Sequence, residues 1–83
     1  MKKESLEQFK TDVETILTKE FGRLPINALS IKLKACGWKN VVENTSRSAL
    51  LKTLRKKCGV KLEDVYVHGR LIRIDVLLNK GEV

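Results

Sequence analysis

The chain has few of the residues on which several classes of protein depend. Its 83 residues include one proline, five glycines and two cysteines, which excludes Pro/Gly-rich linkers, low-complexity tracts and a disulfide-built scaffold. No apolar run exceeds four residues, whereas a membrane-spanning helix needs about 18 or more. The basic N-terminal residues are followed by no apolar segment of signal-peptide length, so we expect an intracellular protein, nuclear or cytoplasmic.

Residues that carry catalysis or bind metals are also sparse. His68 is the only histidine, and it lies at a predicted turn with no nucleophile context around it. Cys36 and Cys58 each end an apolar stripe before a glycine, which favours buried free thiols over a disulfide or a metal site. No glycine-rich nucleotide-binding motif occurs. We therefore expect no enzymatic activity, no metal and no cofactor.

Positive charge, in contrast, is abundant and unevenly placed. The formal net charge is +7, and residues 22–61 hold ten of the 17 Lys and Arg residues but one acid, Glu43. Solubility does not require this segregation, and the repulsion within it lowers stability. The middle of the chain is a candidate surface for a polyanion, and it lacks the exposed apolar face of a membrane-surface helix.

The first predicted helix is acidic and amphipathic. Ser5 can cap it, with Gln8 three residues later, and Gly22 ends it. Its apolar face consists of Leu6, Phe9, Val13, Ile16, Leu17 and Phe21. A short extended segment follows at residues 23–24, because Pro25 disfavours helical backbone in the residue before it.

Two further helices are predicted over residues 26–36 and 46–58, ended by Gly37 and Gly59. Their inward faces are Ile26, Leu29, Leu33 and Cys36 in one helix and Leu50, Leu51, Leu54 and Cys58 in the other. With the leucines of the second inward, its polar and basic residues form the opposite, exposed arc.

Residues 38–44, between these two helices, are a predicted loop. Trp38 is expected to pack this loop onto the core rather than to stack on a base. Asn44 or Thr45 can cap the helix that follows.

From residue 60 the apolar pattern alternates, which predicts strands. Residues 60–78 form a predicted hairpin with His68 and Gly69 as its two-residue turn, since glycine accepts the positive φ required there. Tyr66 is expected to be half-buried. The implied register pairs Val67 with Arg70 and Val65 with Ile72.

This order of helix, extended segment, helix, loop, helix and hairpin resembles that of winged helix-turn-helix domains over nearly the whole chain. The resemblance implies an α+β fold: a three-helix bundle followed by a β-hairpin wing, with the extended segment closing a three-stranded sheet. We expect one domain over residues 1–83, with an ordered core at about 5–78 and a tail or linker at 79–83.

One sub-family, the LOTUS (OST-HTH) domains, is similar at a further point. Its G-x-L-P-h-x-x-L approach to the second helix is matched here by Gly22, Arg23, Leu24, Pro25, Ile26 and Leu29. The long hairpin at residues 60–78 departs from that sub-family and is closer to an ordinary winged helix.

In winged helices the third helix enters the major groove and the wing contacts the backbone or the minor groove. The resemblance therefore makes residues 46–58 the recognition helix, with His68 and Gly69 at the wing tip. Lys and Arg bind phosphate, and Arg can also recognise guanine. Ser and Thr can contact either a phosphate or a base. The candidate nucleic-acid-binding residues are Lys32, Lys34, Lys39, Arg47, Ser48, Lys52, Thr53, Arg55, Lys56, Lys57 and Arg70.

Duplex DNA is preferred to RNA as the expected partner, and no membrane is expected. A plain solvated face is the simpler interpretation of this charge. The alternative function is a protein-interaction or dimerisation module, such as LOTUS-like docking on a helicase or a part of a larger nucleic-acid machine. That function predicts an exposed apolar patch at Val41, Val42, Leu71 and Leu77.

Overall fold

The computed structural model describes residues 3–78 of the chain, and side chains from Ser5 onward. Its helical elements are α1 (Lys3–Lys19), α2 (Ile26–Leu33), the π-helical turn η1 (Lys34–Trp38), α3 (Lys39–Glu43) and α4 (Arg47–Lys57). Its strands are β1 (Arg23–Pro25), β2 (Lys61–Val67) and β3 (Arg70–Leu77). The predicted tail, residues 79–83, lies outside the described residues.

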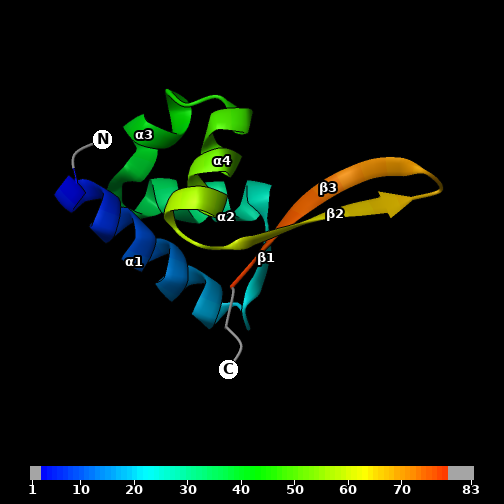
Figure 1. The fold of residues 1–83 in the computed structure, drawn as a ribbon, viewed down its shortest axis with the longest axis horizontal. Helices are drawn as coiled ribbons and strands as arrows, with labels where there is room; N and C mark the ends of the chain where they lie inside the picture. Colours follow the sequence, from blue (N-terminus) through cyan, green and yellow to red (C-terminus); the bar gives the residue numbers. More distant parts are fainter. Residues whose placement is uncertain (1–2, 79–83) are drawn as a thin grey trace.

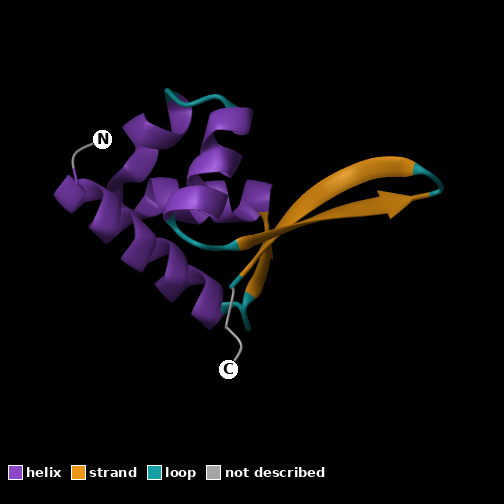
Figure 2. Cartoon of the chain, viewed as in Figure 1, coloured by secondary structure: helices purple, strands orange, loops and turns teal. Residues whose placement is uncertain are grey.

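The helices form one body, and the β2–β3 hairpin projects from its side (Figures 1 and 2). The three strands make an antiparallel sheet in the order β1-β3-β2, so the inner end of β3 is paired on both sides. The predicted α+β fold is confirmed at this level. The extended segment after the first helix does close the sheet, as β1.

The hydrophobic core lies between the helices and the inner half of the hairpin. Trp38 packs edge-on against Phe9, with 5.0 Å between ring centroids, and its indole N–H donates to Asp12 at 2.6 Å. Packing of Trp38 on the core is thus confirmed. The buried apolar residues are Phe9, Val13, Ile16, Leu17, Leu24, Ile26, Leu29, Leu33, Val42, Leu50, Leu54, Cys58, Val60 and Val76.

Both ends of α1 differ from the prediction. The helix begins at Lys3, so Ser5 lies inside it and does not cap it. At the other end the amide of Gly22 donates to the carbonyl of Leu17 at 2.6 Å, a Schellman-type ending. Phe21 occupies the left-handed position of this motif, with φ 62°, and its side chain is 98% exposed. The prediction that Phe21 faces the core is wrong because the chain turns out of the helix before reaching it.

Replacing Phe21 with glycine is expected to stabilise the fold by about 1 kcal/mol relative to Phe21→Ala. Left-handed backbone costs a residue with a Cβ about 1–2 kcal/mol, and glycine offsets part of that gain through its larger unfolded-state entropy. Urea unfolding of both variants measures the difference. Equal stability of the two would show that Phe21 is not strained.

The path after α2 also differs from the prediction. Gly37, with φ 105°, kinks the helix instead of ending it, and residues 39–43 resume as α3 where a loop was predicted. The wider turn of η1 rotates Cys36 off the apolar face, so this thiol is exposed rather than buried. Cys58 is buried as predicted, and burial raises the pKa of its thiol to about 11.

The cap of α4 is Ser46, whose Oγ accepts the amide of Ala49 at 3.2 Å. The predicted caps, Asn44 and Thr45, are wrong by one or two residues. Ser46 takes this role because its extended backbone directs the hydroxyl toward the free amides of the first turn.

The hairpin turn is confirmed at His68 and Gly69, which both have positive φ (52° and 78°). The predicted pairing of Val67 with Arg70 is confirmed, but that of Val65 with Ile72 is wrong. A β-bulge leaves Ile72 without an opposite residue, so the next pairs are Tyr66 with Leu71 and Val65 with Arg73. Tyr66 is 58% exposed rather than half-buried, because this part of the hairpin extends beyond the helices.

Candidate nucleic-acid interface

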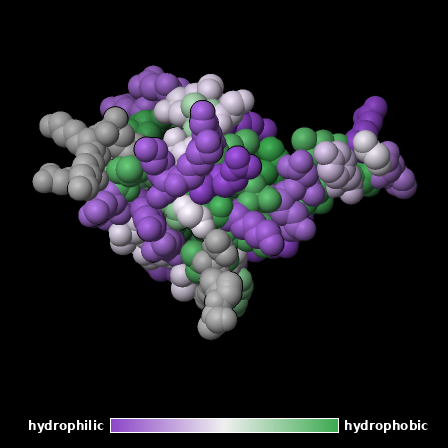
Figure 3. All heavy atoms as spheres, in the orientation of Figure 1, coloured by the Kyte–Doolittle hydropathy of each residue, from purple (hydrophilic) through white to green (hydrophobic). Residues whose placement is uncertain are grey.

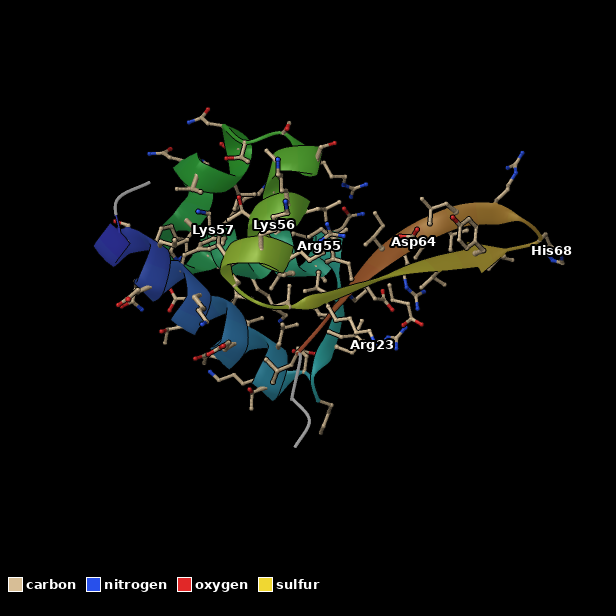
Figure 4. The ribbon with its side chains drawn as sticks, viewed as in Figure 1. Arg23, Arg55, Lys56, Lys57, Asp64 and His68 are labelled. Carbon is tan, nitrogen blue, oxygen red and sulfur yellow. The ribbon has the colours of Figure 1, made fainter. Side chains whose placement is uncertain are left out.

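Helix α4 buries an apolar face and exposes every basic residue that it carries. Leu50 and Leu54 are buried in the core. Ser48 and Ala49 are exposed, and Thr53 is partly buried. The basic residues of the helix are all exposed: Arg47, Lys52, Arg55, Lys56 and Lys57. Figure 4 shows the last three on the outward surface of the helix.

The positive charge of α4 is not neutralised by neighbouring carboxylates. Among the described side chains of residues 5–78, no basic residue of α4 takes part in an ion pair. Arg47 donates to the side-chain oxygen of Asn27 on α2, a neutral partner. The helix contains no acid, so no i,i+4 pair competes for its cations.

The other candidate lysines are placed differently. Lys32 lies 3.5 Å from the carboxylate of Glu20, and Lys34 lies 3.9 Å from that of Glu43. Their charges are therefore partly offset within the chain, whereas Lys39 is exposed at the start of α3. None of these three lysines lines the hollow beside α4 that Lys52, Arg55 and Lys56 share.

The predicted wing tip is remote from α4. Figure 4 places His68 at the far end of the hairpin. Gly69 and Arg70 are its neighbours in the turn, and all three are exposed. A ligand would have to follow the hairpin outward to contact both regions.

A hollow of ≈ 390 Å³ lies between α4 and β2. It is lined by Ser48, Leu51, Lys52, Arg55, Lys56 and Leu62. Leu51 and Leu62 are partly buried against the core, so the hollow combines apolar residues with three exposed cations. Sequence reasoning missed Leu62, since only the tertiary packing of β2 on α4 reveals it. The one indication of the hollow in the sequence was Leu51, which lies at the edge of the apolar arc of the helix.

A second cluster of charge lies on the sheet, centred on Asp75. This residue is 1% exposed, and its carboxylate accepts from Arg23 at 2.8 Å and Arg73 at 2.9 Å. Arg23 also pairs with Glu63. Burial alone raises the pKa of Asp75, but hydrogen bonds from Arg73 and Arg23 outweigh it and hold the pKa below its ordinary value.

The ion pairs around Asp75 limit where an anion can bind. Arg23 on β1 pairs with Asp75 on β3 and with Glu63 on β2, and so links the three strands. Arg73 pairs with Asp75 within β3, so neither arginine adds to the charge of α4. Sequence reasoning missed the network, because an acid in an alternating strand normally faces solvent.

Comparisons with protein-family models, with curated proteins and with solved structures found no match. Within residues 3–78, no helix is long and apolar enough to cross a membrane. The same described part of the chain holds no group of three or more His, Cys, Asp and Glu that could bind a metal ion. The function is therefore inferred from geometry and charge.

Proposed function

We propose that the chain is a winged-helix-like nucleic-acid-binding module that contacts its target mainly through α4. The order of helices and strands and the β1-β3-β2 sheet support this fold. The observation that carries the function is the basic face of α4, which forms no ion pair within residues 5–78 although Lys32, Lys34, Arg23 and Arg73 all do.

The spacing of the cations on α4 fits phosphate binding better than a plain solvated face. Lys52 and Lys56 are one helical turn apart, and like charges at this spacing repel by a few tenths of a kcal/mol, ~0.2–0.5. Bound phosphates offset that repulsion, and their binding releases counterions from the polyanion. Lys52, Lys56 and Lys57 bind phosphates, and Arg55 can also contact a base edge.

Fluorescence anisotropy tests the proposal with labelled duplex DNA, single-stranded DNA and structured RNA. Four displaced counterions give a slope of log affinity against log salt of about −3 to −4 between about 50 and about 200 mM salt. Binding that does not change with salt, or no binding to any probe, would contradict the proposal.

A protein-interaction module is the second candidate. The predicted exposed apolar patch is not formed: Val42 is buried in the core, Val41 and Leu77 are partly buried, and only Leu71 is exposed, at 50%. The observation in favour is Phe21, 98% exposed on left-handed backbone, a conformation that often marks a functional site. If this candidate is right, Phe21→Ala removes a protein partner and leaves nucleic-acid affinity unchanged.

A further inference from the structure

The outer half of the hairpin is apolar and uncovered. Four of the six large hydrophobic residues exposed in the described chain lie there: Tyr66 (58%), Val67 (45%), Leu71 (50%) and Ile72 (51%). Figure 3 shows green, hydrophobic spheres among purple, hydrophilic ones along this projecting arm. A two-stranded hairpin is only marginally stable in water, so an arm built this way is suited to a ligand that covers it.

One face of the arm begins at the hollow beside α4. Side chains alternate along a strand, so Leu62, Asp64 and Tyr66 share a face of β2, and Leu71 opposes Tyr66 across the ladder. Leu62 lines the hollow and packs on the core. Tyr66 and Leu71 therefore form an apolar pair farther out on the same face, separated from Leu62 by Asp64.

We infer that this surface binds single-stranded nucleic acid, with phosphates along α4 and bases on the Tyr66 face of the hairpin. The inference rests on the proposed function, because it uses the same cations. A single strand offers a charged backbone and exposed base faces side by side. It therefore matches the basic surface of α4 next to the aromatic and aliphatic side chains of the hairpin. A duplex buries its base faces in the stack and leaves Tyr66 and Leu71 without a partner.

Asp64 indicates which side of the hairpin the phosphate backbone of a bound single-stranded nucleic acid follows. Its exposed carboxylate lies on the same face, between Leu62 and Tyr66, and Figure 4 shows it partway along the hairpin. It forms no ion pair with any described side chain. A phosphate is repelled there, so the backbone runs on the α4 side and the bases lie over the hairpin. Asp64→Asn is therefore expected to tighten single-strand binding a few-fold, about 2- to 5-fold.

Anisotropy titrations of the full chain with oligo(dT), oligo(rU) and a duplex of equal length test the inference. Tyr66→Ala is expected to weaken binding to the single strands about 10-fold and to leave duplex binding unchanged, since one stacked base contributes about 1–3 kcal/mol. Val67→Ala is the matched control, because Val67 is similarly exposed but lies on the opposite face of β2. It should change neither single-strand binding nor duplex binding. Circular dichroism checks that each variant is folded.

Tighter binding of either single strand than of the duplex, lost selectively in Tyr66→Ala, supports the inference. Equal single-strand affinities for Tyr66→Ala and Val67→Ala would overturn it, as would a wild-type preference for the duplex. In both of those cases the proposed function still stands if changing Lys52 and Lys56 to glutamate weakens binding about 100-fold. If wild type binds none of the three probes, both ideas fail.

Discussion

Replacing Lys52 and Lys56 together with glutamate is expected to weaken nucleic-acid binding about 100-fold while the chain remains folded. Both side chains are exposed and line the hollow beside α4, one helical turn apart. Each charge-assisted phosphate contact is worth about 1.5 kcal/mol or more, and two lost contacts give about 3 kcal/mol. The slope of log affinity against log salt should also become shallower by about 2.

The matched control for this variant changes two lysines on α1. Lys10→Glu with Lys19→Glu alters the net charge by the same amount at exposed positions of a helix outside the hollow. This variant is expected to lose no more than about 3-fold in nucleic-acid affinity, because neither lysine lines the hollow and salt screens exposed charges that make no direct contact. Equal losses in the two double variants would mean that binding follows net charge and not the surface of α4.

Asp75→Asn is expected to lower the free energy of unfolding by about 2–3 kcal/mol at neutral pH. The substitution leaves Arg23 and Arg73 without the carboxylate they share across the sheet. Their side chains are 46% exposed, so partial hydration limits the loss. Urea unfolding measures the effect. Glu63→Gln is the control, because the exposed pair it breaks contributes about 1 kcal/mol or less.

The same substitution should change how stability depends on pH. The pKa of Asp75 is lowered in the folded state, so its contribution is present above the unfolded-state pKa of about 3.9 and is lost as pH falls through the folded-state value. The difference in stability between wild type and Asp75→Asn should therefore shrink below about pH 4. A difference that stays constant down to about pH 2 would show that Asp75 is not ionised in the native sheet.

Much of the fold can be predicted because apolar spacing reports which side of an element is buried. Leu50 and Leu54 lie one turn apart and identify the inner face of α4, and His68-Gly69 identifies the hairpin turn. Gly37 shows the limit of such signals. It indicates a left-handed residue, but it does not indicate whether the chain then forms a loop or, as here, resumes as helix α3 and buries Val42.

The β-bulge could not be predicted from the alternating apolar pattern. Alternation predicts an uninterrupted ladder, and nothing local in the chain distinguishes Ile72 as the unpaired residue. A bulge sets an extra residue of one strand against its partner strand, so it is a property of the pair and not of either segment alone.

The exposed cations of α4 were predictable from the helix alone, since the leucines define the opposite arc. The ion pairs of Lys32 and Lys34 were not, because their partners lie on other elements of the fold. Asp75 is the clearest case. Only the alignment of β1 with β3 brings Arg23 to its carboxylate and allows the charge to be buried.

The most direct test of the central claim is to map the contact surface by amide chemical-shift changes during titration with a short single-stranded oligonucleotide. The account predicts the largest changes in α4, at residues 47–57, and around Tyr66 and Leu71 on the hairpin. Changes confined to α1 or to the surroundings of Phe21, with α4 unaffected, would contradict it.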